Sequence, residues 1–521
     1  MSIDPRAPVV VGVGQVTDRP DGDGAADLAE RDEPVSLMAR AVTAAGEDAG
    51  GRGPSLVRRA QALVVVDPRT WHYRDAGTAL ADLLGVDPAL RLVTAAGGHQ
   101  PQRQVNRAAL AVARGELDVA LVVAGERGQT VAAARRHPDR PVLPWGVQDP
   151  ALPLAVRSDP ERRFTTEAED RHGLDVPTVA AALYEHALRA LAGRPPDEHR
   201  ERIARRWAVH AAVAAANPAA WDRRGPTAEE IASVGEANPM VADPYTRLLC
   251  PNEEVDQAAA LVVCSAEAAR AAGVPEERWV FVVAGADATD HWFLSHRADF
   301  SASPAVRLSG AAALGAAGIG VDDVAHLDLD ASSPAALEVS ATELGVDPDD
   351  PARPPTVTGG PTFAGSPGDG YGAHAVATLV RCLRRDPGAW GLVTSVGFAL
   401  SAHSLGLYRS APSLPRTAGA TDAGARVEEA AGFRWADPQT SVSALAQRAS
   451  DADASGEVTV ETYSIPYGPD GAPARAVVAC LTPDGRRSWA SVTDPDQLEL
   501  LAVEECCGRL GRLRDGVVDL R

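Results

Sequence analysis

The chain has 521 residues, which predicts more than one domain. Hydrophobic residues make up 45% of the sequence, enough for a large core, whereas aromatic residues make up only 4%. The formal net charge is −21, from 50 basic and 71 acidic residues. This surplus of acidic groups argues against nucleic acid or an anionic membrane surface as the main partner.

The six cysteines form neither a CxxC pair nor a Cys/His cluster at zinc-binding spacing. In a chain of this length, that pattern favours reduced thiols and an intracellular location. The first residues, MSIDPRAPVVVGVGQ, lack the charged leader and long apolar run of a signal peptide. No apolar stretch reaches the length of a membrane span. We therefore expect a cytoplasmic protein with no metal site.

Strands alternate with helices in the first part of the chain. Residues 8–14, 62–66 and 117–123 are short β-branched runs, typical of buried parallel strands. Residues 36–45 and about 102–114 have the composition of helices. This alternation predicts an α/β layer with a mostly parallel sheet.

The pattern changes between about Arg127 and Pro244, where Pro- and Arg-rich loops surround helices. The clearest helices are residues 177–191 and 199–216, and the second has one amphipathic face. The apolar run 256–265 reads as a strand that returns to the first sheet. We therefore interpret the intervening region as a helical insertion within the first α/β half.

A second series of α/β elements begins at residues 280–284 and ends with a strand at 391–396. Its order of strands and helices repeats that of the first series, which favours a duplicated unit over a short solenoid period. Residues 407–425 read as a linker. The strand runs after it, separated by turns such as Pro-Asp-Gly, predict a small C-terminal β domain, of which an OB-like barrel is one form.

Five stretches, in order along the chain, resemble motifs of the thiolase superfamily. AALAVARGELDVALVVAGE, at residues 108–126, resembles the helix and strand behind the thiolase nucleophile. Residues 252–265 resemble the segment at the join between the halves, and residues 317–345 resemble a catalytic unit of the second half. Residues 359–375 and 391–408 resemble the last two catalytic loops.

The resemblance covers roughly residues 5 to 410 and implies a thiolase-like duplicated core of five αβαβα layers. The tail is similar to the extra C-terminal domain of type-1 thiolase-like proteins, often labelled acetyl-CoA acetyltransferases. Together these features predict two thiolase-like halves, a helical loop domain and a C-terminal β domain. The expected bounds are 1–128 and 246–278 for the first half, 129–245 for the insertion, 279–409 for the second half, and 425–521 for the β domain.

Thiolase chemistry requires a thiolate activated by a helix N-terminus and a histidine, a group that moves a proton, and two oxyanion holes. By resemblance, the nucleophile position falls on Gly98, which has no side chain. The Asn/His-Glu pair falls on Asp330 and Ala331, and the Gly-His-Pro histidine falls on Ser366. The second cysteine falls on Ser395. The sequence thus departs from the family at each catalytic group.

Several functional groups remain near these positions. His99 follows Gly98 and is read either as a helix-entry residue or as part of the site, with the first slightly favoured. His374 reads more readily as a packing or capping residue than as a base. His403 is a candidate to face the old catalytic pocket, with the functional and structural readings equally weighted. Ser366 and Ser395 could donate hydrogen bonds to a thioester oxygen.

Two further features concern the binding of coenzyme A. The run GSPGDGYG, which includes Gly365 and Gly368, could cradle pantetheine or phosphate with backbone N–H groups, or could be a tight connection that fits only glycine. Arg162 and Arg163 lie in the region that, in thiolases, covers coenzyme A. Solvated helix faces are the alternative reading for such an arginine pair.

The leading hypothesis is a protein that binds acyl-CoA thioesters in lipid metabolism. It predicts acetyl-CoA acetyltransferase-like acyl transfer without the usual cysteine, coenzyme A as a non-covalent ligand, and a degenerate active site. The alternative is a non-catalytic acyl-CoA or acyl-chain binding protein, or a scaffold. A homodimer, or a protein partner docked through the C-terminal domain, is also considered.

Overall fold

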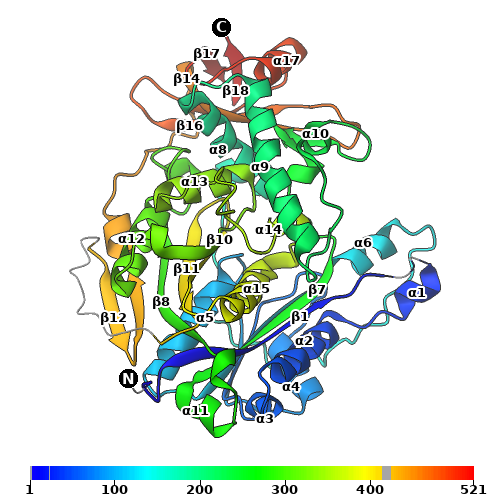
Figure 1. Cartoon of the computed structure of the whole chain (residues 1–521). Helices are drawn as coiled ribbons and strands as arrows, with labels where there is room; N and C mark the ends of the chain where they lie inside the picture. The colour runs from blue at the N-terminus through cyan, green and yellow to red at the C-terminus, as the bar shows by residue number, and fades with distance from the viewer. Residues whose placement is uncertain (1–2, 21, 23, 413–423) are drawn as a thin grey trace.

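In the computed structural model, which describes residues 3–20, 22, 24–412 and 424–521, one central sheet runs through the molecule (Figure 1). Nine described strands follow one another in the order β3-β2-β4-β7-β1-β8-β11-β10-β9, and the hairpin β12–β13 joins at β8. Their bounds are β1 (Pro8–Thr17), β2 (Ala62–Val65), β3 (Leu90–Val93), β4 (Val119–Arg127), β7 (Asp256–Ser265), β8 (Val280–Thr289), β9 (Val324–Asp328), β10 (Trp390–Gly397), β11 (Ala402–Arg409), β12 (Arg426–Ala430) and β13 (Phe433–Asp437).

The sheet consists of two halves with matching strand order. Strands β2-β4-β7-β1 on one side correspond to β9-β10-β11-β8 on the other. The halves meet where Val9 pairs with Phe281 and Val10 pairs with Val280. The predicted duplication of an α/β unit is therefore confirmed.

The expectation of a mostly parallel sheet is wrong. Strands β2, β3 and β4 pair in parallel, as do β9 and β10. Strands β7 and β11, however, pair antiparallel with both of their neighbours. The connection between β10 and β11 is a short turn, and a turn of that length joins only antiparallel strands.

Helices form three layers around the two half-sheets. Helices α5 (Gln100–Ala113) and α15 (Tyr371–Arg385) lie between the halves and contact strands of both. One outer face is covered by α2 (Pro34–Asp48) together with α3 (Gly53–Arg58) and α4 (Ala76–Leu84). The other is covered by α12 (Pro304–Ala317) with α13 (Pro334–Leu344). The predicted five-layer core is therefore present.

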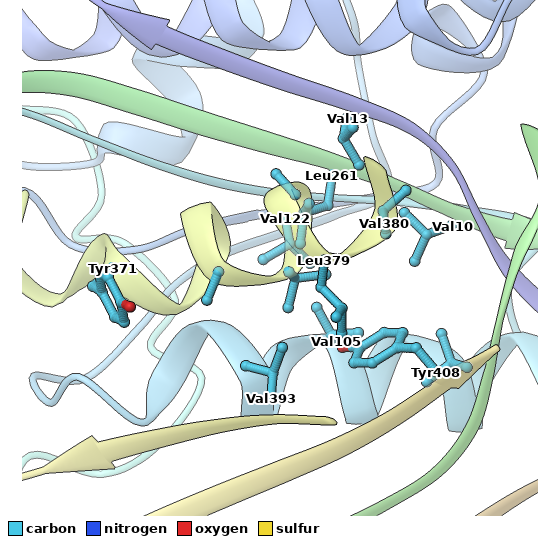
Figure 2. Close-up of a cluster of buried hydrophobic side chains, with 14 of the residues drawn as sticks. Val10, Val13, Val105, Val122, Leu261, Tyr371, Leu379, Val380, Val393 and Tyr408 are labelled. Atoms are coloured by element: carbon cyan, nitrogen blue, oxygen red, sulfur yellow. The ribbon is translucent and has the colours of Figure 1, made fainter. Parts of the chain in front are cut away.

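The middle layer is held by buried apolar side chains from both halves. Figure 2 shows Val105 of α5, Leu379 of α15, Val122 of β4, Val393 of β10 and Tyr408 of β11 in one cluster. Each of these side chains is fully buried. Because burial of such a side chain contributes about 1.5–3 kcal/mol, the cluster holds both central helices between the two half-sheets.

The insertion after β4 contains five helices among its described residues and packs against the C-terminal domain (Figure 1). They are α6 (Gly128–Arg136), α7 (Glu167–Arg171), α8 (Pro177–Leu191), α9 (Pro196–Ala216) and α10 (Ala228–Ala232), and β5 (Met240–Asp243) and β6 (Tyr245–Thr246) follow. Strand β5 pairs with the C-terminal domain, where Ile465 lies opposite Asp243. Helix α8 lies across the same domain.

The C-terminal domain is a second sheet, with strand order β15-β16-β18-β17-β14 and then β5-β6. Its elements are β14 (Gly456–Pro466), β15 (Ala476–Leu481), β16 (Arg487–Val492), α17 (Pro495–Val503), β17 (Leu510–Arg514) and β18 (Val517–Leu520). The preceding helix α16 (Gln439–Ser443) packs on β8 and α12 of the core.

Only part of the linker predicted at residues 407–425 lies within the described residues. Its first residues, up to Arg409, belong to β11, so the prediction is wrong there. Residues 413–423 lie outside the described residues. The hairpin β12–β13 comes next and pairs with β8 of the core rather than with the C-terminal sheet.

The edge strand β3 is covered by a segment of the insertion. Val93 N–H donates to the Val156 carbonyl at 2.9 Å, and Ser158 N–H donates to the Val93 carbonyl at 3.0 Å. Asp159, next in the chain, forms an ion pair with Arg107 of α5 at 2.8 Å. These contacts hold the segment against the sheet edge.

Across the described part of the chain, no helix is long and apolar enough to cross a membrane.

Candidate functional site

A cavity of about 350 Å³ lies at the ends of several core strands, beneath the insertion. Its wall is built by residues 96–98 before α5, residues 330–333 after β9, residues 366–371 before α15, and the turn of residues 396–401 after β10. The start of α8 and residues 251–253 complete the lining. The carboxyl ends of parallel strands are where α/β sheets commonly bind ligands, so this cavity is the candidate site.

Asp330 places a buried carboxyl group in the cavity wall. Its two oxygens accept the Ser332 N–H at 3.0 Å and the Val396 N–H at 2.9 Å. Its own N–H donates to Thr394 Oγ1 at 2.9 Å, which fixes the residue between β9 and β10. Burial raises the pKa of Asp330 to about 6, although the hydrogen bonds act in the opposite direction. Such a carboxyl can take up and return a proton near neutral pH.

Gly98 lines the cavity but has no room for a side chain. A Cβ atom at this position would lie 2.5 Å from the Val396 carbonyl oxygen. That oxygen belongs to the backbone of the second half, so a substitution requires the turn after β10 to move. The glycine at this position is therefore required by the close approach of the two halves.

An ion pair joins the halves at one side of the cavity. Arg69, just after β2, donates from Nη2 to both carboxylate oxygens of Asp369 at 2.6 and 2.7 Å. Asp369 also accepts the Gly97 N–H at 2.8 Å. Burial opposes the charge on Arg69, but Asp369 outweighs it and the pKa of Arg69 is raised. The pair positions the loop that contains Gly97 and Gly98.

Glu126, at the end of β4, lies behind this pair and outside the cavity lining. Its carboxylate accepts the Arg69 N–H at 2.5 Å and the Thr70 N–H at 3.0 Å. Burial raises the pKa of Glu126 to about 7 despite these bonds. A Cβ atom at Gly368, where φ is +53°, would lie 2.6 Å from Glu126 Oε1. The glycine-rich loop thus passes directly over a buried carboxyl group.

The turn after β10 forms the cavity wall with an unusual backbone. Phe398, Ala399 and Leu400 have φ values of 51°, 39° and 61°, the left-handed region. Each such residue costs about 1–2 kcal/mol when it is not glycine. Outside contacts hold the turn: Tyr184 Oη donates to the Ala399 carbonyl at 3.0 Å, and His403 Nε2 lies 2.9 Å from the Leu400 carbonyl.

Four of the residues singled out from the sequence lie outside the cavity lining. His374 faces Gln15, with 3.3 Å between Nδ1 and Nε2, and burial lowers its pKa to about 3. Burial also lowers the pKa of His99 to about 3. The Ser395 hydroxyl is buried against α15, and His403 holds the turn from behind.

Ser395 is the predicted counterpart of the second cysteine, and the three histidines are candidates because they lie close in sequence to motif positions. Strands and helices turn alternate side chains away from a site, and sequence spacing near a loop does not show which way each one points.

The remaining predicted residues divide into two groups. Ser366 and Gly368 line the cavity together with Gly98 and Asp330. Gly365, Arg162 and Arg163 do not. Gly365 packs against Gln257, where a Cβ would lie 2.1 Å from Oε1. Arg162 stacks over Trp292 at 4.1 Å, and Arg163 pairs with Asp170 at 2.5 Å.

Sequence reasoning missed Arg69, Asp369 and Phe398 of the cavity wall. One signal was available, because Arg69 follows a predicted strand and such strand ends border sites in α/β folds. Asp369 lies within the glycine-rich run that had been singled out as a whole. Nothing in the residues around Phe398 indicates a left-handed turn, since the sequence there contains only one glycine, Gly397.

Comparison with known proteins supports this architecture. A family model described as the thiolase-like protein type 1 additional C-terminal domain matches residues 437–516. Among solved structures, a monomeric SCP2-thiolase-like protein type 1 from Mycobacterium smegmatis aligns with a TM-score of 0.80 and 29% identity, covering 100% of both chains. No curated protein matches the chain.

Two more distant structures share the core fold. An acetyl-CoA acetyltransferase from Syntrophomonas wolfei aligns with a TM-score of 0.53 and 17% identity over 79% of this chain and 100% of that one. The Ltp2–ChsH2(DUF35) aldolase aligns with a TM-score of 0.56 and 22% identity over 78% of this chain and 99% of that one.

The duplicated five-layer core and these alignments define a protein of the thiolase superfamily. The matched C-terminal domain and the full-length alignment make the chain similar, along its whole length, to thiolase-like proteins of type 1 that carry the additional C-terminal domain.

Proposed function

We propose that this protein binds acyl-CoA thioesters in the cavity and moves a proton at the carbon next to the thioester carbonyl, without a cysteine acyl-enzyme. The observation that carries the proposal is Asp330. It is a buried carboxyl with a pKa raised to about 6, and it lies in the cavity wall. A general base with this pKa is largely ionised at pH 7 and can still return the proton.

The proposed step is a proton transfer from the substrate to Asp330 that forms an enolate. The Asp330 carboxylate takes the proton from the α-carbon. The C–H electron pair forms the C=C bond, and the carbonyl π pair moves onto the thioester oxygen, which gives an enolate. Backbone N–H groups are candidates to receive that negative charge, because Gly98 and Gly397 both line the cavity. The Cβ position of Gly397 lies 3.4 Å from Gly98 N, so the two segments converge.

A covalent thioester intermediate lacks support. None of the described lining residues is a cysteine. Cys250 is adjacent in the chain to Pro251, which lines the cavity, but burial raises the pKa of Cys250 to about 12. A thiol with that pKa is not ionised at neutral pH and is a poor nucleophile. The proposal therefore assigns the chemistry to proton transfer rather than to acyl-enzyme formation.

Binding of the nucleotide end of coenzyme A is proposed at a surface hollow next to the cavity. The hollow is lined by Arg19, Trp221, Asp222, Arg223, Arg224 and Asn252. Asp222 pairs with Arg224 at 2.6 Å, which leaves Arg19 and Arg223 as the cations without a carboxylate partner in the described lining. Pro251 and Glu253, which flank Asn252 in the chain, line the cavity itself. Arginines suit phosphate groups, and an indole ring suits stacking with adenine.

The test combines binding with isotope exchange. Acetyl-CoA and butyryl-CoA are titrated by calorimetry, and loss of the α-proton signal in D₂O is followed by NMR. Wild type is compared with Asp330→Asn and with Asp322→Asn, whose carboxyl is exposed at the surface. We expect exchange in wild type and in Asp322→Asn. Loss of exchange with retained binding in Asp330→Asn supports the proposal.

The second candidate function is non-catalytic binding of an acyl-CoA or an acyl chain. It is favoured by the apolar part of the lining, which includes Leu174, Ala181, Leu294, Val396 and Phe398. Tight binding by wild type without exchange would select this function. Absence of binding by either thioester would overturn the acyl-CoA assignment itself.

A further inference from the structure

We propose that the C-terminal β domain sets the shape of the cavity wall, and that Arg487 is the positioning residue through which it acts. Arg487 holds residues 294–298, and Arg297 of that segment holds the turn of residues 397–401. Leu294 and the turn both line the cavity. The inference rests on the proposed function only for the measurement of ligand binding, whereas hydrogen–deuterium exchange tests it independently.

The first link is Arg487 on β16, whose side chain is fully buried. Nε and Nη2 each donate to a carboxylate oxygen of Glu461, both at 2.6 Å. Nη1 donates to the carbonyl oxygens of Leu294 and Arg297, both at 2.7 Å. The charge is thus neutralised inside the C-terminal domain, and the remaining donor reaches across to the core.

Two other residues that follow the core in the chain, Trp489 and Arg448, form hydrogen bonds with the same segment. Trp489 Nε1 donates to Ser295 Oγ at 2.9 Å. Arg448 donates from its backbone N–H to the His296 carbonyl at 3.1 Å and from Nε to the Ala298 carbonyl at 3.0 Å. Arg487 and Arg448 therefore fix the backbone of residues 294–298, and Trp489 holds the side chain of Ser295.

The second link is Arg297, which is buried between the segment and the turn. It donates to the Leu400 carbonyl and, at 3.2 Å, to Ser401 Oγ. Asp290 lies 3.0 Å from its Nη1 and balances its charge. Arg297 can reach the turn in this way only while its own backbone is fixed.

The turn needs this external support because three successive residues, none of them glycine, have left-handed backbone angles. Such a conformation persists only where the surroundings over-determine it. Release of residues 294–298 frees the Leu400 carbonyl and lets the turn relax. Val396 donates to the Asp330 carboxylate at 2.9 Å, so a relaxed turn also changes the hydrogen bonding of the candidate base.

The test compares Arg487→Gln and Trp489→Phe with a matched control, Arg486→Gln. Arg486 precedes Arg487 but pairs with Asp451 and Asp484, both within the C-terminal domain. Trp489→Phe is included because Arg487→Gln leaves Glu461 without its partner, whereas the phenylalanine removes one hydrogen bond and creates no buried charge.

Hydrogen–deuterium exchange of the peptide that spans residues 396–401 is the first readout. Its protected amides include Val396, bonded to Asp330, and Ser401, bonded to the Gly397 carbonyl at 3.0 Å. We expect exchange there to rise about tenfold in Arg487→Gln and several-fold in Trp489→Phe, with less than about a twofold change in Arg486→Gln. The second readout is the Kd for butyryl-CoA, expected to rise in the same order.

Unchanged exchange at residues 396–401 in both Arg487→Gln and Trp489→Phe overturns the inference. An increase spread evenly over all peptides, together with a fall in Tm, overturns it too, since that is general loss of stability. A wild type that binds no thioester contradicts the proposed function and leaves the exchange readout to decide this inference.

Discussion

Each half of the duplicated core buries a carboxyl group near the end of a parallel strand, Glu126 in the first half and Asp330 in the second, and the two differ in their access to the cavity. Glu126, at the end of β4, is covered by the glycine-rich loop and bonded to the backbone of Arg69 and Thr70. Asp330, after β9, faces the cavity. Burial raises the pKa of both, to about 7 and about 6. A perturbed pKa alone therefore does not identify a reacting group, and access to the cavity decides which of the two can act.

The largest expected effect concerns this difference in access. Asp330→Asn should lower the rate of α-proton exchange by about 10²–10⁴-fold, the usual contribution of a general base. Glu126→Gln should leave the rate within about threefold, because its carboxyl does not reach the cavity. NMR exchange in D₂O measures both. A large loss in Glu126→Gln would show that the two carboxyls act as one unit.

The next effect is on stability, where the two carboxyls should behave alike. A raised pKa means that the folded state binds the proton more tightly, so each group's stabilising contribution is present at low pH. It is lost as the pH rises from about 4 to 7. Each shift of about two pKa units is worth on the order of 3 kcal/mol. Relative to Asp330→Asn or Glu126→Gln, wild type should lose that amount between pH 4 and pH 8 in chemical unfolding. A flat difference would contradict the shared burial.

A smaller effect concerns the packing at Gly98, where the two halves are in close contact. Gly98→Ala should reduce the free energy of unfolding by about 1–3 kcal/mol, because its Cβ meets the Val396 carbonyl. Ser395→Ala is the control from the second half. Its buried hydroxyl has no hydrogen-bond partner among the described residues, so its removal should be neutral or slightly stabilising. Thermal unfolding compares the two, and equal losses would show that the halves are not in close contact at Gly98.

The smallest effect concerns the ion pair between the halves. Asp369→Asn should cost about 1 kcal/mol of stability, since the Arg69 side chain is half exposed and water screens the pair. The loop with Gly97 loses part of its anchor, so its hydrogen exchange should rise more than that of α15. Equal protection in wild type and variant would show that the pair does not position this loop.

The architecture could be predicted from the sequence because apolar periodicity and family motifs both act over long segments. The strand at residues 256–265 and the helix at residues 177–191 were predicted with the bounds that the structure has. Strand direction could not be predicted. The pattern of β7 is a continuous apolar run, which fits a buried strand of either direction.

The site could be predicted only in part. Gly98, Asp330, Ser366 and Gly368, which motif order suggests, line the same cavity, since a motif fixes the loop in which a residue lies. The direction of a side chain within that loop depends on the backbone angles of its neighbours, as at His403 beside the left-handed turn. Those angles are fixed by contacts with residues 290–297, far away in the sequence, and the local residues do not reveal them.

The segment over β3 has a consequence for assembly. An uncovered edge strand is a template on which a second chain can add its own strand. Here residues 156 and 158 already form hydrogen bonds with the N–H and the carbonyl group of Val93. Another copy of this protein could join the sheet at that edge only by first displacing them. A self-associated form of the protein that keeps this segment in place must therefore use a surface other than the β3 edge.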